Sequence, residues 1–233
     1  MNDDHPGRKA LTIEAVLRIT LSFPLLALML FLPAGRWDWT MGWALIAVML
    51  VLVCINMAVL LVKNPEVIRE RMRGGKGTRK WDRLVAGSMV PFALAVVLLG
   101  GLDQRFGWSP PFAPWIQVGA LGMLVLGDLI FLWAMAENKF FASMVRIQSE
   151  RGHYVVTGGP YRYVRHPGYV GWYILMIGLA VALGSLWGFI PAAVLLALML
   201  VRTALEDRTL RKELAGYQEY AERVRYRLIP GVW

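Results

Sequence analysis

The stretch GGPYRYVRHPGY at positions 158–169 gathers reactive and ligand-binding groups inside a chain that is otherwise very apolar. Arg162, Arg165 and His166 provide positive charge and directed hydrogen-bond donors, and the neighbouring tyrosines can stack on a flat ring. Pro167 suits the first position of a helix, because its missing N–H would be unpaired there anyway. The free backbone N–H groups at that helix end would then form an anion site beside these side chains.

A second polar group follows the last apolar run, where Glu206 and Asp207 come shortly after Arg202. If the last two helices form a hairpin, Glu206 would lie near His166. The resulting compartment would combine anion-binding, cation-binding and aromatic groups. S-adenosylmethionine suits it, since this cofactor has a carboxylate, an ammonium, a sulfonium and an adenine. Methyl transfer is a direct displacement that requires alignment and exclusion of water but no metal.

The elements that must position these groups are long apolar runs, and a run of about 20 such residues can cross the bilayer core. The runs are Leu11–Leu32, Thr40–Val62, Leu84–Gly101, Trp115–Ala136 and Gly168–Val201. The last run is too long for one span, and Gly184–Gly188 interrupts it. We therefore expect an all-α integral membrane protein with about six transmembrane helices. The last two would form a tight helical hairpin, followed by a cytoplasmic C-terminal helix.

Charge sets the orientation of this bundle. Of the 25 Lys and Arg residues, only Arg18, Arg36 and Arg105 fall outside the segments that a cytoplasmic N-terminus would place in the cytoplasm. This bias follows the positive-inside rule and predicts that both termini are cytoplasmic. The basic residues are distributed according to the membrane topology and do not form a stripe on a soluble domain. Membrane lipids are therefore the expected partners, and nucleic acid is not. The stretches VRIQSERGH and RYRLIPGVW resemble those of bacterial proteins, which predicts a bacterial inner membrane.

The chain divides into two parts. Residues 1–136 would form four transmembrane helices whose role toward a substrate the sequence does not give, and residues 137–233 would form the cofactor-binding module. Cys54 is the only cysteine, so no disulfide can form within the chain. The three histidines are too scattered for metal-ligand spacing, and no metal is expected.

Two charged residues lie within the apolar runs, and charges are costly in lipid. We expect Arg18 and Asp128 to face the interior of the bundle. Small residues let membrane helices pack closely, and Gly119, Gly122 and Gly127 would do so for the fourth span.

The segment HYVVTGGPYRYVRHPGYVGW at positions 153–172 resembles the signature of the isoprenylcysteine carboxyl methyltransferase and phospholipid N-methyltransferase superfamily. The matching residues are Val156, Thr157, Gly159, Tyr161, Arg165, His166, Pro167, Tyr169 and Gly171. A second block of that superfamily is matched by Glu206, Asp207, Leu210, Tyr217 and Tyr220. The resemblance covers roughly residues 138–233, and the two blocks flank a helical hairpin, as in the family.

The resemblance implies an integral-membrane methyltransferase that binds S-adenosylmethionine on the cytoplasmic side and methylates a lipophilic or membrane-delivered acceptor. The residues assigned to the cofactor are Val156, Gly159, Tyr161, His166, Pro167, Tyr169 and Glu206. The residues assigned to catalysis are Arg165, Arg202 and Glu206. Either arginine would orient the nucleophile, and Glu206 would close the site.

Two departures leave the acceptor open among a carboxylate, an amine, a thiol and a phenol. Asp207 replaces the second glutamate of the family, and the stretch ELAGYQEY differs from the tail of the eukaryotic prenylcysteine enzymes. Two other functions compete with methyl transfer. One is an NADPH-dependent sterol-type membrane reductase, because some of those enzymes end in a stretch similar to RYRLIPGVW. The other is a non-enzymatic lipid-binding membrane protein. The sequence leaves the oligomeric state open.

Overall fold

The computed structural model describes residues 6–72 and 77–233, with side chains from residue 20 onward, and every regular element in that part of the chain is helical. The α-helices are α1 Pro6–Ala34, α2 Thr40–Lys63, α3 Pro65–Met72, α4 Lys80–Phe106, α5 Pro114–Glu137, α6 Pro167–Leu183, α7 Phe189–Glu213 and α8 Tyr217–Arg223. Two short 3₁₀ turns, η1 Ser149–Arg151 and η2 Gly159–Arg162, lie between α5 and α6.

Four of these helices, α2, α4, α5 and α7, are long and apolar enough to cross a membrane. Two shorter apolar helices, Thr20–Ala34 within α1 and the whole of α6, lie beside them. Large apolar side chains on the outer face of α2 are exposed, including Val51 at 56%. A surface of this kind is stable in lipid, where helices satisfy their own backbone hydrogen bonds. The expected class, an all-helical integral membrane protein, is thereby confirmed.

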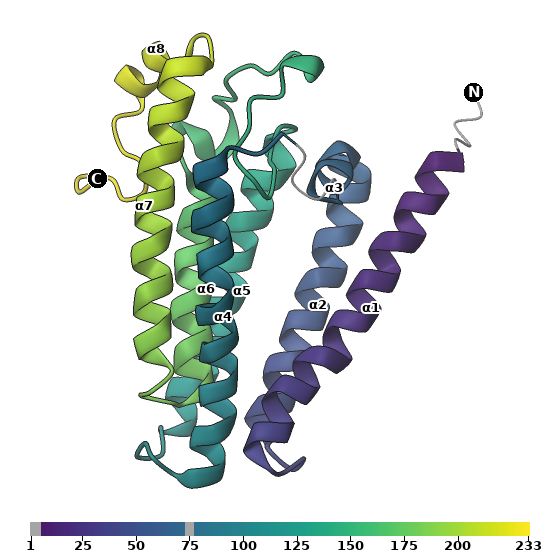
Figure 1. Ribbon diagram of the computed structural model, residues 1–233, viewed down its shortest axis with the longest axis vertical. Coiled ribbons are helices and arrows are strands. Elements are labelled where there is room, and N and C mark those ends of the chain that lie inside the picture. Colours follow the sequence, from purple (N-terminus) through teal and green to yellow (C-terminus); the bar gives the residue numbers. More distant parts are fainter. Residues whose placement is uncertain (1–5, 73–76) are drawn as a thin grey trace.

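The helices are arranged so that the polar segments meet at one end of the bundle. Figure 1 shows α4 to α7 packed together, with α1 and α2 along one side. In the same view α3, α8 and the connection between α5 and α6 lie toward the upper end. The most extensive helix contact joins α5 to α6, and α4 packs against both α1 and α7. This packing brings the start of α6 and the second half of α7 to the same end as α3.

The contact between α5 and α6 depends on two glycines that face each other. A Cβ atom on Gly171 would lie 2.4 Å from the carbonyl oxygen of Gly127, and one on Gly127 would lie 2.6 Å from the carbonyl oxygen of Gly171. The expectation for Gly127 is therefore confirmed. It is wrong for Gly119 and Gly122, because a Cβ atom at either position would meet nothing within 4 Å.

We expect Gly171→Ala to destabilise the folded protein by about 1–3 kcal/mol, because the added methyl group forces the backbones of α5 and α6 apart. Thermal unfolding in detergent measures this loss. Gly122→Ala is the matched control, and it should be neutral or stabilising by up to about 1 kcal/mol, since alanine favours helix. Equal melting temperatures for Gly171→Ala and the wild type would contradict the close contact.

Asp128 lies inside the bundle, as predicted. It is 8% exposed, and both of its carboxylate oxygens accept hydrogen bonds from Asn56 Nδ2, at 2.9 and 3.0 Å. A donor from α2 thus compensates for the burial of a charge on α5. The side chain of Arg18, for which the same was expected, lies outside the described residues.

Candidate active site

A cavity of about 260 Å³ opens at the end of the bundle where α3, α6 and α7 meet. Its walls come from the end of α5, the connection between α5 and α6, the start of α6 and the second half of α7. Seven of the residues predicted to form the site line it: Val156, Tyr161, Arg165, His166, Tyr169, Arg202 and Glu206. The fold thus brings the two sequence blocks to one cavity.

The other two predicted residues do not line the cavity but shape its wall. Pro167 is the first residue of α6, and its neighbours His166 and Gly168 face the cavity. Gly159 begins η2 with a φ of +52°, a conformation that favours glycine. A Cβ atom there would lie 2.9 Å from Glu137 Oε2, so the absence of a side chain lets η2 pack against the end of α5.

His166 is the predicted residue most clearly available to a ligand. Its ring stacks on Tyr169, with the centroids 5.6 Å apart and the planes at 11°. Its Nε2 atom is buried, lies 3.5 Å from Asp207 Oδ1 and makes no hydrogen bond within the described part of the chain. A buried polar atom without a partner is costly, so His166 presents a group that a ligand can satisfy.

The two adjacent carboxylates on α7 have different surroundings. Glu206 lines the cavity and accepts a short hydrogen bond from the hydroxyl of Tyr169. Asp207 Oδ1 lies 3.5 Å from His166 Nε2, whereas Glu206, which we expected near His166, bonds to Tyr169, the residue on which the His166 ring stacks. Successive residues on a helix point about 100° apart, so Glu206 and Asp207 cannot both face the cavity.

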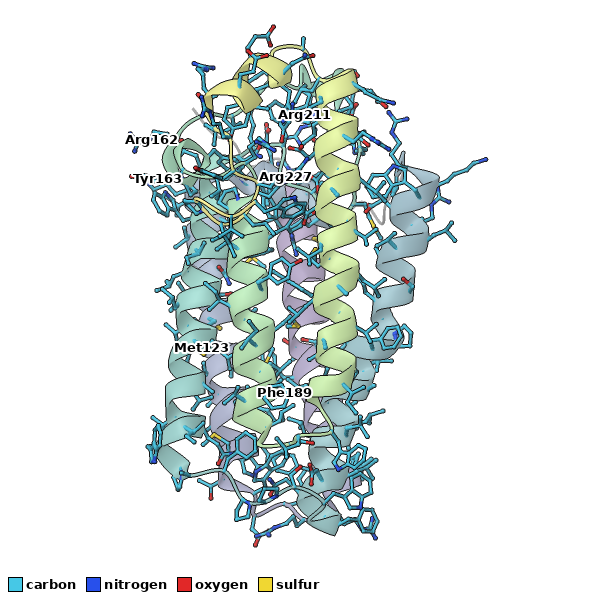
Figure 2. The ribbon with its side chains drawn as sticks, turned by 90° about the vertical axis from the view of Figure 1, so that its left-hand side faces the viewer. Met123, Arg162, Tyr163, Phe189, Arg211 and Arg227 are labelled. Carbon is cyan, nitrogen blue, oxygen red and sulfur yellow. The ribbon has the colours of Figure 1, made fainter. Side chains whose placement is uncertain are left out.

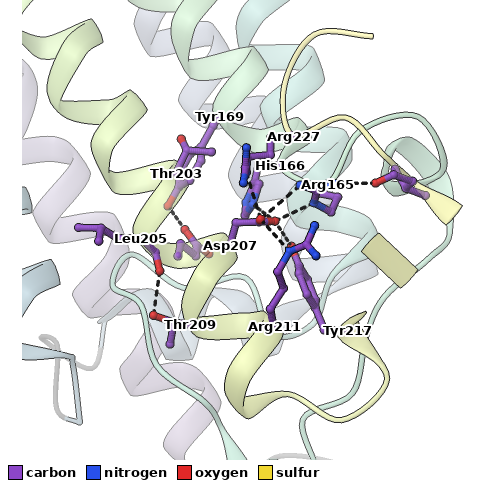
Figure 3. A network of polar contacts seen from close by, with 12 residues as sticks. Arg165, His166, Tyr169, Thr203, Leu205, Asp207, Thr209, Arg211, Tyr217 and Arg227 are labelled. Carbon is purple, nitrogen blue, oxygen red and sulfur yellow. Dashed lines mark hydrogen bonds and ion pairs between the residues drawn. The ribbon is translucent and has the colours of Figure 1, made fainter. Parts of the chain in front are cut away.

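Asp207 is the centre of a buried network that ties the helices to the C-terminal segment (Figure 3). It accepts hydrogen bonds from Arg165 Nε at 2.7 Å and from the hydroxyl of Tyr217 at 3.1 Å. Arg211 Nε and Arg227 Nε also donate to it, at 3.2 and 3.0 Å. A single carboxylate thus orients side chains from four parts of the chain.

Arg165, predicted to be catalytic, has all three of its side-chain nitrogens engaged. Nε and Nη2 donate to Asp207, and Nη1 donates to the carbonyl oxygens of Val224 and Arg225. The backbone N–H groups of Arg165 and His166 also donate to the carbonyls of Tyr226 and Arg227. These contacts fix the loop before α6 against the C-terminal segment, which is the geometry of a positioning residue.

Arg202, the other predicted catalytic arginine, is oriented by a partner from the N-terminal half. Its Nε donates to Asp82 Oδ1 at 2.7 Å, and its Nη2 donates to Asp82 Oδ2 and to the carbonyl of Ser143. Its Nη1 makes no hydrogen bond to the described residues, and the guanidinium lies 5.7 Å from the ring centroid of Tyr169. Arg202 therefore enters the cavity with a fixed orientation and donors left for a ligand.

Two residues of this site were missed in the sequence. Asp82 is fully buried and accepts from the backbone N–H of Val145 as well as from Arg202. Arg71 lines the cavity from α3, with its guanidinium 5.6 Å from the ring centroid of Phe131, and it has no carboxylate partner among the described residues. Both lie in a basic stretch that is charged throughout, and no pattern there separates them from solvated neighbours.

Three tyrosines of the cavity wall are held as neutral donors. Burial raises the pKa of Tyr161, Tyr217 and Tyr220 above its usual range. The hydroxyl of Tyr220 donates to the carbonyl of Tyr161, and the hydroxyl of Tyr161 accepts from Asn138 Nδ2. None of the three is therefore a phenolate near neutral pH, and together they offer aromatic faces to a flat ring.

His153 should stay neutral down to about pH 4. Burial, reinforced by the charges of Arg146 and Arg151, lowers its pKa to about 4. Its Nδ1 accepts from the backbone N–H of Gln148 at 3.2 Å. Because the folded pKa lies below the ordinary value of 6.5, this residue contributes stability that is complete above pH 6.5 and is lost as the pH falls toward 4.

An NMR titration of ring-labelled His153 checks this expectation. The chemical shifts should stay constant from pH 8 to about pH 5 and change only below that range, whereas a midpoint near 6.5 would contradict the buried position. His153→Phe is the control, because it removes the titrating group while keeping an aromatic ring against Phe140, whose centroid lies 4.3 Å from that of His153.

Comparisons with known proteins match the part of the chain that builds this cavity. Residues 120–212 match the profile of the isoprenylcysteine carboxyl methyltransferase (ICMT) family. The chain is similar to protein-S-isoprenylcysteine O-methyltransferase B of Arabidopsis thaliana, with 29% identity over 59% of this chain and 67% of that protein. It is also similar to protein-S-isoprenylcysteine O-methyltransferase of Homo sapiens, with 31% identity over 47% of this chain and 40% of that protein.

The similarity to the enzyme of Schizosaccharomyces pombe is higher but shorter, at 40% identity over 30% of each chain. Among solved structures, the eukaryotic intramembrane Ras methyltransferase ICMT matches with a TM-score of 0.52 and 17% identity. This match covers 93% of the present chain and 86% of that chain. At this identity it concerns the fold, and it agrees with the helical membrane architecture described above.

Proposed function

We propose that the chain is a member of the isoprenylcysteine carboxyl methyltransferase family of integral-membrane methyltransferases, to which it is similar over residues 120–212. We further propose that it transfers the methyl group of S-adenosylmethionine to a carboxylate of a lipophilic acceptor. The observation that carries the proposal is the cavity that both sequence blocks line. It is lined by His166, whose buried Nε2 makes no hydrogen bond within the described residues, by Glu206, and by two arginines, Arg71 and Arg202, that have side-chain donors without a hydrogen-bond acceptor in the same part of the chain.

The residues of the cavity fit the cofactor. The orphaned Nε2 of His166 and the N-terminus of α6 would take its carboxylate, and Glu206 would take its ammonium. The buried tyrosines, Tyr161 and Tyr220 among them, would contact the adenine. When bound, S-adenosylmethionine would supply a methyl group on a positively charged sulfur, which an oxygen nucleophile would take up with S-adenosylhomocysteine as the leaving group.

The arginines favour a carboxylate as the acceptor. Arg202 is fixed by Asp82, and its free Nη1 can hold a carboxylate in one orientation through a charge-assisted hydrogen bond. A carboxylate is already ionised at neutral pH, so no residue has to act as a general base. The relatives are named for O-methylation of an isoprenylcysteine, which is consistent with an acidic group on an apolar chain.

We propose that the two parts of the chain bind different ligands. Residues 137–233 supply most of the cavity wall and would bind the cofactor. Residues 1–136 would bind the acceptor, because they contribute Arg71 and Phe131 to the cavity.

The topology we propose has six transmembrane helices, with α6 and α7 as a hairpin and both termini in the cytoplasm. The short apolar helices Thr20–Ala34 and Pro167–Leu183 would then cross the membrane together with the four long ones. The relatives named above are eukaryotic, so the proposed bacterial inner membrane rests only on the resemblance of short C-terminal stretches to bacterial proteins. Cysteine-accessibility labelling of single-cysteine variants in intact and lysed cells tests the orientation.

The activity is tested with purified protein, methyl-labelled S-adenosylmethionine and two acceptors, an N-acetylated S-prenyl cysteine and its carboxamide. We expect label in the carboxylate compound alone, in a base-labile methyl ester that releases methanol in alkali. Label in the carboxamide, or no label in either compound with folded protein, would contradict a carboxylate acceptor.

Arg71→Gln should raise the KM for the carboxylate acceptor roughly tenfold or more, because a charge-assisted contact is lost. The affinity for S-adenosylhomocysteine should change little, since Arg71 belongs to α3 and to neither of the two sequence blocks assigned to the cofactor. Arg69→Gln is the matched control, being an exposed arginine of the same helix that does not line the cavity. Identical KM values for the two variants would exclude Arg71 from acceptor binding.

A further inference from the structure

The outer side of α7 carries a second polar site, separate from the cavity. A groove of about 500 Å³ runs between α7 and the C-terminal segment. Its floor includes the apolar residues Ala204 and Leu205, and the buried Asp207 lies at its base. The cations that line it are Arg208, Arg211, Lys212 and Arg227. Figure 2 shows two of them, Arg211 and Arg227, near the upper end of α7 on the same side of the molecule.

The groove carries more positive charge than its own carboxylate can balance. Asp207 is already paired with the buried Arg165 through two hydrogen bonds before Arg211 and Arg227 are counted. Arg208 and Lys212 are exposed and form no ion pair within the described residues. Four cations around one neutralised carboxylate make a site for an anion.

The apolar surface below the cations extends toward the middle of the bundle. On α7 the positions 201, 205, 208 and 212 follow helical spacing, so Val201, Leu205, Arg208 and Lys212 lie along one stripe. Val201 is 50% exposed although it is apolar, and Ile229 on the neighbouring C-terminal segment is 56% exposed. The stripe therefore changes from apolar to cationic along α7. Such a surface matches an amphiphile that has an apolar chain and an anionic head.

We propose that this groove binds an anionic phospholipid, with its phosphate among Arg208, Arg211, Lys212 and Arg227 and an acyl chain along Val201 and Leu205. Basic residues next to the end of a membrane helix attract anionic lipid headgroups. The bound phosphate would complete the charge balance around Asp207, which also holds Arg165 beside the cavity. A free phosphate would satisfy the cations but would leave the exposed apolar stripe uncovered.

The test measures lipid binding to the purified full chain by native mass spectrometry, with phosphatidylglycerol and phosphatidylcholine compared at equal concentration. The wild type should retain phosphatidylglycerol preferentially. Arg208→Gln combined with Lys212→Gln should weaken that binding roughly 25-fold, since each cation near an anionic headgroup contributes roughly fivefold. These two side chains are exposed and unpaired, so the variant should fold.

The matched control is Arg223→Gln combined with Arg225→Gln, which removes the same charge from exposed positions outside the groove. If binding falls equally in both double variants, the effect is due to diffuse surface charge, and the proposal is overturned. Equal retention of the two lipids by the wild type would overturn it as well.

A further arm adds glycerol 3-phosphate or inorganic phosphate in excess. Displacement of the lipid by this excess would mean that the site takes the free anion and that the acyl contact is wrong. This readout is independent of methyl transfer.

Discussion

Replacing Asp207 by asparagine should destabilise the folded protein by about 3–5 kcal/mol, because breaking a buried ion pair on one side leaves the other charge uncompensated. The side chains of Arg165 and Asp207 are 2% and 1% exposed, so water cannot replace the lost carboxylate. Arg211 and Arg227 would lose the negative charge with which both are paired in the same step. We expect a large fall in the melting temperature in detergent and release of the C-terminal segment to protease.

The neighbouring carboxylate provides the matched control. Glu206→Gln is also a carboxylate-to-amide change on α7, but Glu206 lines the cavity, and its hydrogen bond among the described residues is the one from Tyr169. This variant should keep nearly the wild-type melting temperature and lose affinity for S-adenosylhomocysteine. If Asp207→Asn were as stable as Glu206→Gln, the network around Asp207 would not be structural.

Replacing His166 by alanine should weaken binding of S-adenosylhomocysteine by roughly 10- to 100-fold, the effect of losing a hydrogen bond to a charged group. Stability should change less, because Nε2 of His166 makes no hydrogen bond within the described part of the chain and only approaches Asp207 Oδ1, at 3.5 Å. Isothermal titration calorimetry measures the affinity, and a melting curve of the same sample reports the fold.

Tyr163→Ala is the control for that experiment. Tyr163 belongs to the same sequence stretch, is 61% exposed and does not line the cavity. Its replacement should leave the affinity unchanged. Comparable losses in both variants would mean that the whole loop, and not the imidazole, determines binding.

The sequence predicted the helices and the meeting of the two blocks because both depend on local pattern. Apolar runs of membrane length mark α2, α4, α5 and α7, and a proline after His166 marks the first residue of α6. Charges and aromatic residues that cluster at helix ends within one module must then lie near each other.

Partners from distant segments could not be predicted in the same way. Arg202 and Asp82 are 120 residues apart, and only the packing of α4 against α7 brings them together. The roles of Glu206 and Asp207 depend on the rotation of α7 about its axis. In a helix whose apolar residues lie on every side, no stripe in the sequence fixes that rotation.

The glycines of α5 show the same limit. Gly119, Gly122 and Gly127 are alike in sequence, but only Gly127 faces a backbone carbonyl of α6. Small residues allow a close approach between helices, but they do not identify which helix packs against them. Arg71 was missed for a related reason, since α3 is short and nothing in its composition shows that it packs over Phe131.

The most direct test of the proposed function is a calorimetric titration of detergent-purified, folded wild-type protein with S-adenosylhomocysteine, and in parallel with NADPH. We predict saturable binding of S-adenosylhomocysteine at one site per chain, with micromolar affinity on the order of −8 kcal/mol, and no binding of NADPH. Absence of S-adenosylhomocysteine binding would contradict a cofactor site between the two blocks, and saturable NADPH binding in its place would point to a reductase.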